Sequence, residues 1–446
     1  MISDVAIHAG IPPQPRSEAD GVCSTFPYVP LGILLKQRTE FTTVLDEQVY
    51  KRCRAQVRAQ GVVLRDTVLG SEIKIKKQQV CRSDDFLVAE IDAKVGGFGI
   101  VPPELDGAIV SSHYFLFEIC KTALDPSFLG FAVRTKSFQS QVSARGSTNY
   151  ASIRPKHVLG YQIPLPPLPE QRAIAHVLRT VQRAKEATER VIAATRELKR
   201  SLMRHLFTYG PVSVGEADRV PLKETEIGLV PEHWEVVKLG SVAAIGNGST
   251  PKRTNSAYWD GGTIPWLTSG KVHEAIIRQA DELVTQLACK ECHLPLVPRG
   301  SLVVAITGQG KTLGNAAILA LDATVNQHLA YLQFRASHMV PEFVLAYLRH
   351  RYEDLRRASQ AGGSTKGALT CGFLATYPLP VPPVAEQREV ACVLSAVDHK
   401  IEVEERRQQA LDTLFRTLLD NLMTGKVRVT QMEAAVDSRV EVGTCR

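Results

Sequence analysis

Apolar residues recur at alternating steps of four and three along a stretch close to the C-terminal end of the sequence. The positions in this series are Val390, Leu394, Val397, Ile401, Leu411, Phe415, Leu418 and Leu422. Only Glu404 and Gln408 interrupt it. A seven-residue repeat of this kind predicts a long helix with one apolar seam, which must be buried against a partner helix.

A weaker seam in the same phase lies near the middle of the chain, with Thr188 and Thr195 among its positions. Its apolar members are Ile174, Leu178, Val181, Ile192, Leu202 and Leu206. Gly210 and Gly425 mark the ends of two helices of about 36 residues, or roughly 54 Å each. The helices can pair within the chain as an antiparallel spacer or join separate chains as an oligomerising coiled coil, and polar seam positions can fix the register.

The two predicted helices belong to a repeated unit. The segment PLPPLPEQRAIAHVLRTV matches PVPPVAEQREVACVLSAV at a constant shift of 216 positions. Upstream, AIVSSHYFLF (108–117) matches ATVNQHLAYL (323–332), which pairs His113 with His328. The sequence therefore predicts two copies of one plan, each with a globular segment of about 140 residues followed by a Pro-rich segment and a helix.

The globular segments have the pattern of short strands separated by turns, with a few helices. Strand-like stretches include FLVAEI (86–91), YFLFEI (114–119), GSLVVAI (300–306) and AYLQF (330–334). Helices are expected at Ser127–Arg134 and Pro341–Arg351. This mixture predicts α+β domains.

Composition narrows the class of protein only slightly. With 446 residues, of which 44% are hydrophobic, the chain can bury more than one core. A net charge of +7 suits a polyanionic partner without identifying one. No apolar run is long enough for a membrane helix, and the N-terminus has no export-like segment. We therefore expect a cytoplasmic protein without membrane contact, with its nine cysteines as reduced thiols.

The stretch AITGQGKT (305–312) has a permissive form of the phosphate-binding loop. Such a loop needs a helix that opens at Thr312, yet the next residues, LGNAAILALDATV, are strand-like. The equivalent stretch of the first copy, EIDAKVGGFG (90–99), keeps the glycines and a lysine without G-K-T. Both copies fit an exposed, basic, Gly-rich loop better, and a nucleotide-binding switch through Lys311 and Thr312 is an alternative.

Other candidate chemistry is incomplete. The D-x-K pattern of metal-dependent nucleases occurs at Asp92 and Lys94, but the second copy has Thr-Gly-Gln at 307–309 instead. Cys289 and Cys292 form half of a zinc site without a second pair of ligands. The sequence also contains no evident nucleophile–base pair or base-methyltransferase signature. We therefore predict neither a metal site nor a catalytic residue.

The repeated motifs resemble those of a known family. IPLPPLPEQR and LPVPPVAEQR, each leading into a long helix, are similar to motifs of the specificity subunit of type I restriction-modification systems. YWDGGTIPWLTSGKV (258–272) and TLGNAAIL (312–319) support the same likeness, and FGIVPPELDGAIV (98–110) resembles the recognition domains of this family. The resemblance covers nearly all of residues 26–427.

The resemblance implies an α+β fold with an internal pseudo-twofold repeat. Two strand-rich target recognition domains would be separated by two long antiparallel helices that form an intramolecular coiled coil. The expected segments are 1–160 for domain 1 with an N-terminal extension over 1–25, 161–210 for a Pro-rich segment and spacer helix, 211–375 for domain 2, 376–426 for the second Pro-rich segment and helix, and 427–446 for a tail.

The resemblance also implies a function. A subunit of this kind has no catalytic activity and recognises an asymmetric bipartite site in double-stranded DNA. It directs two methyltransferase subunits and the restriction subunits, which translocate and cut DNA, to that site. S-adenosylmethionine and ATP with magnesium are then expected on the partner subunits, and no cofactor on this one. The alternative from another class is a coiled-coil adaptor without specific DNA recognition.

Basic side chains would supply affinity for phosphates, and polar side chains on loops would read base edges. The candidates in the first domain are Lys74, Lys76, Lys77, Lys94, Ser111, Ser112 and His113. Those in the second are Lys252, Arg253, Ser269, Lys271, Gln309, Lys311, Asn315, Gln327 and His328. The repeated E-Q-R motif supplies Glu170, Gln171, Arg172, Glu386, Gln387 and Arg388. These six residues would dock a partner, fix the domain against the helix, or simply start the helix.

Overall fold

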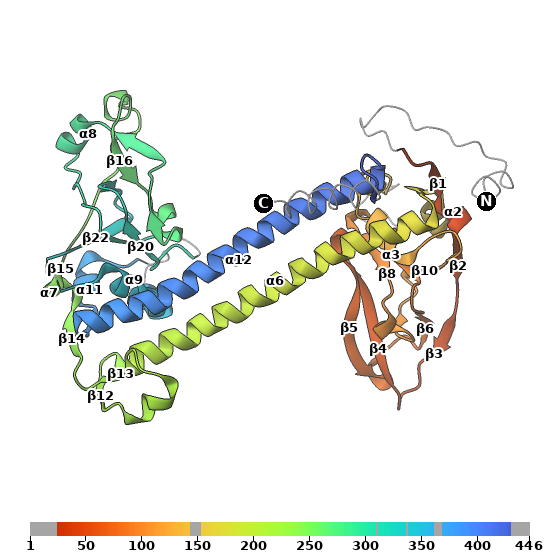
Figure 1. Ribbon diagram of the computed structural model, residues 1–446, viewed down its shortest axis with the longest axis horizontal. Helices are drawn as coiled ribbons and strands as arrows, with labels where there is room; N and C mark the ends of the chain where they lie inside the picture. Colours follow the sequence, from red (N-terminus) through yellow and green to blue (C-terminus); the bar gives the residue numbers. More distant parts are fainter. Residues whose placement is uncertain (1–24, 143–152, 309–310, 336–337, 361–367, 430–446) are drawn as a thin grey trace, which may run out of the picture. The chain divides into compact units, whose positions relative to one another are not determined.

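The computed structural model describes residues 25–142, 153–308, 311–335, 338–360 and 368–429. The chain forms two compact units, a first unit of residues 1–189 with 407–446 and a second unit of residues 190–406. The division falls within the two long helices, so that each unit contains a part of both (Figure 1). The expected N-terminal extension up to residue 24 and the tail from residue 430 lie outside the described residues.

The first unit is built around two sheets whose neighbouring strands are mostly antiparallel. Its strands are β1 (Tyr28–Pro30), β2 (Leu35–Arg38), β3 (Phe41–Thr43), β4 (Val49–Gln56), β5 (Gly61–Leu69), β6 (Lys77–Val80), β7 (Phe86–Ala89), β8 (Phe98–Ile100), β9 (Ile109–Val110), β10 (Tyr114–Ile119) and β11 (Gln162–Pro164). Its short helices are α2 (Leu31–Leu34), α3 (Pro126–Ala132), α4 (Lys136–Gln139) and α5 (Pro155–Gly160). One sheet has the strand order β2-β10-β7-β8, the other β3-β6-β9-β4-β5, and β1 pairs with β11.

The alternation along β7 explains how this unit is layered. Phe86 and Val88 face the core that includes α3 and the start of the long helix, whereas Leu87 faces the core shared with the second sheet. All three side chains are at most 2% exposed. Because successive side chains of a strand point to opposite faces, a strand that is apolar on both faces must lie between two layers.

The second unit repeats this plan. Its strands are β12 (Leu222–Thr225), β13 (Gly228–Pro231), β14 (Glu235–Lys238), β15 (Ala243–Asn247), β16 (Ile264–Leu267), β17 (Ile276–Ile277), β18 (Glu282–Val284), β19 (Leu302–Ala305), β20 (Ala316–Leu319), β21 (Thr324–Val325), β22 (Leu329–Phe334) and β23 (Pro378–Val381). Its helices are α7 (Leu239–Val242), α8 (Gln286–Glu291), α9 (Pro341–His350), α10 (Tyr352–Gln360) and α11 (Cys371–Thr376).

The sequence repeat is also a structural repeat. The order β15-β22-β19-β20 in the second unit corresponds to β2-β10-β7-β8 in the first, and the pair β14–β23 corresponds to β1–β11. In β19, Leu302 and Val304 face α9, while Val303 faces the core below the three-stranded sheet β18-β16-β21. The α+β prediction is therefore confirmed, including strands at all four quoted stretches and helices α3 and α9.

The two predicted long helices are present and longer than expected. α6 spans Leu168–Tyr209 with 42 residues, and α12 spans Val384–Thr424 with 41. Each begins just after its Pro-rich segment, because proline is tolerated in the first turn and not further inside. Gly210 and Gly425 follow the two helices with φ of +78° and +70°, the left-handed conformation that commonly ends a helix.

Within each unit, α6 and α12 run antiparallel and side by side (Figure 1). In the first unit, Lys185 forms an ion pair with Asp412 and Gln408 bonds to Glu189 at 3.0 Å. In the second unit, two further ion pairs join the helices. They are Arg196–Glu405 and Lys199–Asp398. In each unit the α12 partner number falls as the α6 number rises, which is the signature of an antiparallel pair.

The seam predicted from the sequence is the buried face of the helix pair. Leu178 and Ile192 of α6 and Val390 and Leu394 of α12 are at most 4% exposed. Burial of one such side chain contributes about 1.5–3 kcal/mol, whereas an exposed ion pair contributes about 0–1 kcal/mol. The apolar seam therefore stabilises the coiled coil, and the ion pairs mainly fix its register. None of the helices in the described part of the chain is long and apolar enough to span a membrane.

Candidate nucleic-acid interface

Exposed polar side chains gather at one edge of the second unit's sheet. Gln327, in the turn between β21 and β22, accepts a hydrogen bond from Thr250 Oγ1 at 2.5 Å and contacts His328 Nε2 at 3.2 Å. His328 bonds through Nδ1 to the hydroxyl of Thr307, which follows β19. Because Gln327 and His328 are exposed and yet tied to neighbours, they present donors and acceptors in a fixed orientation, which is what reading a base edge requires.

Lys311 lies beside this cluster in sequence, in the exposed loop between β19 and β20. Its carbonyl oxygen accepts a hydrogen bond from Tyr352 Oη at 2.9 Å, which fixes the backbone while the ammonium group stays in solvent. Residues 311–315 form a turn that leads into β20, antiparallel to β19, so no helix opens at Thr312. The loop therefore lacks the helix N-terminus that a nucleotide phosphate site requires. Gln309 lies outside the described residues.

Lys271 is not available to a DNA backbone in this structure. It is only 8% exposed, and its ammonium group forms ion pairs with Glu274 and Asp281, both at 2.8 Å. These partners, Asp281 first, raise the pKa of Lys271 above its usual value. The side chain follows the turn Ser269–His273 toward two carboxylates of its own unit, so a DNA contact at Lys271, which stays a prediction, would require these ion pairs to open.

Arg253 is also engaged within the unit. It forms an ion pair with Glu282, which raises the pKa of the arginine, and its guanidinium lies 4.0 Å from the ring centroid of Trp259 and 5.0 Å from that of Trp266. Stacking and ion pairing hold the group in one position, and a phosphate contact at Arg253 stays a prediction. Three further candidates are Lys252, which is exposed, and Ser269 and Asn315, which are half-buried.

In the first unit, Glu90 binds His113 and Arg154 at the corresponding place. Its carboxylate accepts His113 Nδ1 at 2.9 Å and Arg154 Nη1 at 3.2 Å. Lys94 is exposed nearby in sequence, on the turn Asp92–Val95. His113 and His328, paired by the sequence repeat, thus both bond to a side chain that follows a central strand, β7 in one unit and β19 in the other.

The lysines around β6 lie at the same end of the second sheet as Ser111 and Ser112. Gln79 of β6 faces Val110 of β9 in an antiparallel register, so residues that precede β6 run alongside residues that follow β9. Lys77 is exposed with its ammonium 4.8 Å from the Phe41 ring centroid, whereas Lys76 is tied to Asp46 and to the carbonyl of Gly70. Lys74 is exposed, as is Ser112, and Ser111 is half-buried.

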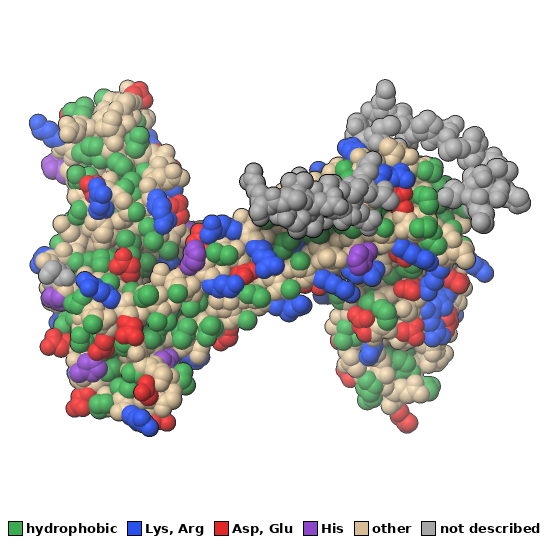
Figure 2. Space-filling view, in the orientation of Figure 1, with side chains coloured by type: hydrophobic (Ala, Val, Ile, Leu, Met, Phe, Trp, Pro, Cys, Tyr) green, Lys and Arg blue, Asp and Glu red, His purple; other side chains and the backbone are tan. Residues whose placement is uncertain are grey.

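Some residues of these clusters have no evident signal in the sequence. Arg154 lies 64 positions from Glu90, and Thr250 lies 77 from Gln327. Only the fold brings them together. The repeat offers one indirect signal, because pairing His113 with His328 directs attention to whatever follows β7 and β19. Basic groups are spread along the long helices as well (Figure 2), so positive charge alone does not single out one face.

The E-Q-R motifs have the same geometry in both units. Gln171 Oε1 accepts the Asp125 N–H at 2.8 Å, and its Nε2 donates to the carbonyl oxygens of Ala123 and Pro166, both at 2.9 Å. Its equivalent Gln387 makes three matching bonds. They run to Val340 N at 2.9 Å, His338 O at 3.0 Å and Pro382 O at 2.9 Å. Both amides are 0% exposed. They fix each globular part to its helix, one of the roles that the sequence allowed.

The glutamates of the motif are also engaged within their own units. Glu386 accepts hydrogen bonds from His233 Nε2 and Trp234 Nε1, both at 2.8 Å, and Glu170 accepts Arg428 at 2.7 Å. The arginines of the motif are different. Arg172 and Arg388 are exposed, and neither has a bonded partner within the stretches that the structure describes. Of the six motif residues, these two are the ones whose functional groups are free to bind another molecule.

Cysteines do not form a metal centre in the described part of the chain. Cys289 and Cys292 are half-buried free thiols near the end of α8, and burial raises the pKa of Cys289. The stretches that the structure describes contain no group of three or more His, Cys, Asp or Glu side chains positioned to hold a metal ion.

Comparison with known proteins decides the family. A family model described as the type I restriction modification DNA specificity domain matches residues 38–195 and again residues 231–413, one match for each copy of the repeat. Together the matches cover well over half of the chain. The chain belongs to the type I restriction-modification specificity family. As a specificity subunit it is the DNA-recognition component of its class, and it is not the catalytic subunit.

Individual relatives agree with this assignment. A Methanocaldococcus jannaschii protein provisionally named the type I restriction enzyme MjaX specificity subunit is 26% identical over 377 residues, covering 81% of this chain and 84% of the relative. The MjaVIII specificity subunit of the same organism is 23% identical over 385 residues, covering 83% and 85%. The crystal structure of a type I restriction-modification S subunit from M. genitalium has the same fold, with a TM-score of 0.59 and 15% identity over 92% of this chain and 98% of that one.

Proposed function

We propose that this specificity subunit reads an asymmetric bipartite sequence in double-stranded DNA, one half-site with each unit. The observation that carries the proposal is that the two units share one strand order but present different side chains at equivalent edges. The first presents His113 with Arg154 on Glu90, and the second presents Gln327 with His328. Because the major groove offers a distinct donor and acceptor pattern for each base pair, different side chains on one scaffold read different bases.

Affinity in this proposal comes from exposed cations and specificity from the tied polar groups. Lys94 in one unit and Lys311 in the other lie on Gly-rich loops that follow a central strand, where the backbone can approach a DNA strand closely. Each phosphate contact releases counterions, so binding must weaken steeply with salt. Fixed side chains such as His328 add discrimination because a wrong base leaves their bonds unmade.

The family assignment supports a proposal about the partners. We infer that two methyltransferase subunits and the restriction subunits assemble on this chain, and that Arg172 and Arg388 contribute to their docking because both are exposed at the same place in the two repeats. We further propose that S-adenosylmethionine and ATP with magnesium bind to those partners, and that the complex works in the cytoplasm, where the DNA is.

The experiment is to map adenine methylation across the genome with and without the gene, in the presence of the methyltransferase partner. We expect a bipartite motif that disappears with the gene and returns with the wild-type copy. His328→Ala should relax one half-site and His113→Ala the other, while His399→Ala, an exposed histidine of α12, serves as the control. An unchanged methylome would support instead a coiled-coil adaptor without DNA recognition.

A further inference from the structure

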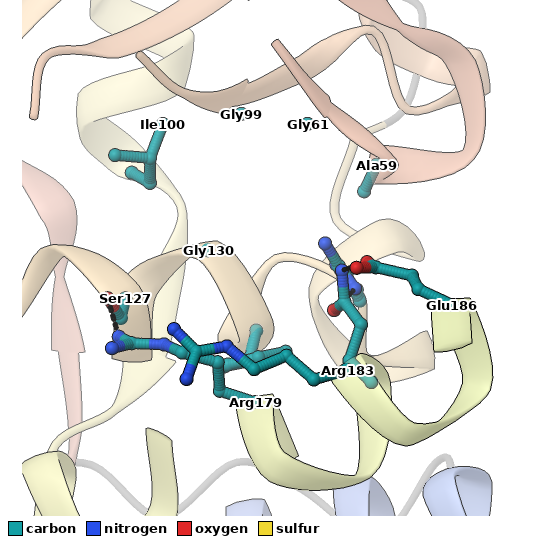
Figure 3. Close-up of a pocket in the computed structure, with 12 residues that line it drawn as sticks. Ala59, Gly61, Gly99, Ile100, Ser127, Gly130, Arg179, Arg183 and Glu186 are labelled. Carbon is teal, nitrogen blue, oxygen red and sulfur yellow. Dashed lines mark hydrogen bonds between the residues drawn. The ribbon is translucent and has the colours of Figure 1, made fainter. Parts of the chain in front are cut away.

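The first unit contains a pocket that none of the candidate recognition residues lines. It has a volume of about 280 Å³ and lies between β5, β8, α3 and the first half of α6. Figure 3 shows the side chains of Arg179 and Arg183 extending from α6 along one side, with Gly130 above them and Gly99 and Gly61 on the opposite wall. Arginine side chains therefore line the helical side of the pocket, and backbone atoms of glycines line its sheet side.

Glycines of β5, β8 and α3 line the pocket opposite the arginines. A Cβ atom on Gly99 would lie 2.6 Å from the Cα of Gly61, and one on Gly130 would lie 3.3 Å from a side-chain carbon of Ile100. A side chain on Gly99 would clash with the backbone of β5, and one on Gly130 would press against Ile100, which lines the pocket. Backbone that is free of side chains on one side lets a ligand approach closely, as glycines do in loops that hold phosphates.

The charges that line the pocket do not cancel. Three guanidinium groups, those of Arg134, Arg179 and Arg183, line it together with a single carboxylate, Glu186. No salt bridge joins any of these arginines to a carboxylate in the described part of the chain. Glu186 accepts its bond from Gln182 Nε2 at 3.0 Å instead.

The contacts of the three arginines leave some of their N–H donors without an acceptor among the described residues. Arg134 donates through Nη1 to Gln182 Oε1 at 2.9 Å, but its Nε is buried without a partner among the described residues. Burial lowers the pKa of Arg134, the direction expected for a cation that lacks a counterion. Among the residues that the structure describes, Arg179 bonds only to the hydroxyl of Ser127, and Arg183 is exposed to solvent.

We propose that this pocket binds a phosphate group. A guanidinium presents parallel N–H donors that match the oxygens of a phosphate, and two neighbouring arginines with no carboxylate partner repel each other until an anion lies between them. The space suits a phosphoryl group with part of the molecule that carries it. That molecule is either a free phosphorylated metabolite or the DNA backbone. Phosphate binding itself uses none of the recognition residues and can be tested without DNA, whereas the DNA-backbone source rests on the proposed function.

The test compares thermal unfolding of the full chain in potassium phosphate and in potassium chloride at equal ionic strength. We expect phosphate to raise the midpoint in a saturable way. Arg183→Gln should weaken the apparent phosphate affinity by about tenfold or more, because a charge-assisted bond is lost. Arg190→Gln, an exposed arginine two turns further along α6, is the matched control and should behave as wild type. Gly130→Leu keeps every charge but fills the pocket, and should also abolish the effect.

Three results would overturn the proposal. They are no difference between phosphate and chloride for the wild-type chain, an equal effect of potassium acetate, or full phosphate binding by both Arg183→Gln and Gly130→Leu. A DNA arm then identifies the source of the phosphate. If phosphate competes with duplex DNA at constant ionic strength and Arg183→Gln weakens DNA binding, the pocket holds the backbone. If DNA affinity is unaltered, the pocket holds a free phosphate ester.

Discussion

Gln171 and Gln387 are equivalent residues that make the same three buried hydrogen bonds, one set in each unit. In both, the amide oxygen accepts a backbone N–H next to the first helix after the central sheet, and the amide nitrogen donates to two carbonyl oxygens. The bonds connect the globular part, the Pro-rich segment and the long helix at one point. We call this pair of residues the glutamine staples.

Removing a staple should destabilise the unit that contains it. Gln171→Ala leaves buried backbone groups without partners, at a cost of about 1–3 kcal/mol for each group that water does not reach. We expect the urea midpoint of unfolding to fall, and Gln387→Ala to do the same through the second unit. The control is Gln409→Ala, at an exposed position of α12, which should leave the midpoint in place. An unchanged midpoint in both staple variants would show that the bonds are dispensable.

The stability of the first unit should depend on pH through Asp85. Burial raises the pKa of Asp85 to about 6, even though the Arg82 N–H and the Arg38 guanidinium bond to it. An aspartate in an unfolded chain titrates near 3.9, so between about pH 4 and 6 the folded state holds a proton that the unfolded state has released. The stabilisation is complete below about pH 4 and is lost as pH rises through about 6.

The variant that tests this is Asp85→Asn, which cannot titrate. Compared with the wild-type chain, its urea midpoint should lose the component that falls between pH 4 and 6.5. Asp260→Asn, at an exposed position, should keep the wild-type profile. If Asp85→Asn and the wild type have parallel profiles, the carboxylate titrates as an ordinary exposed one.

Replacement of two lysines of the second unit should affect different properties, DNA binding for one and stability for the other. Lys311→Ala removes an exposed cation, so we expect weaker DNA binding and a salt dependence whose slope drops by about 0.9 per lost phosphate contact, with normal stability. Lys271→Ala leaves Glu274 and Asp281 without their shared cation and should lower the melting temperature instead. Filter binding at several salt concentrations, together with calorimetry, separates the two. A Lys311→Ala chain with wild-type salt dependence would remove Lys311 from the interface.

The length of the helix pair should set the gap between half-sites. Inserting one heptad in α6 and the facing heptad in α12 lengthens the pair by about 10.5 Å, which is about three base pairs of DNA. The methylated motif of this variant should have the same bases with a longer gap. Replacing one heptad by another of the same length is the control. If the insertion alters the bases of one half-site and leaves the gap, the spacer interpretation is wrong.

Periodicity made the repeat and the helix pair predictable. The seam from Val390 to Leu422 is a one-dimensional pattern whose period states both the element and the face that is buried. The repeat also exposed the false phosphate-binding loop, because the first copy lacks G-K-T. In the same way, the strand alternation at β7 and β19 follows directly from apolar runs that no half-exposed strand would carry.

The direction of individual polar side chains was not predictable in this way. Lys271 was expected at the DNA surface, and its burial depends on a short turn that points it toward Asp281, ten positions later. Arg134 meets Gln182 across 48 positions, so the cationic pocket exists only in the folded unit. Pairings at such separations carry no local signal, and the E-Q-R motif alone could not state which of its members is buried.

Gln171 also fixes the angle at which α6 leaves the globular part of the first unit. A helix of 42 residues, such as α6, is about 63 Å long, so it acts as a lever whose root is held by Gln171. A tilt of about 3° at the root displaces the tip by roughly 3 Å, close to the rise of one base pair. If the helix were loosely attached, the distance that it sets would vary by about one base-pair step. The attachment at the first turn of the helix, rather than the geometry of its far end, therefore decides how accurately a helix of this length can set a distance.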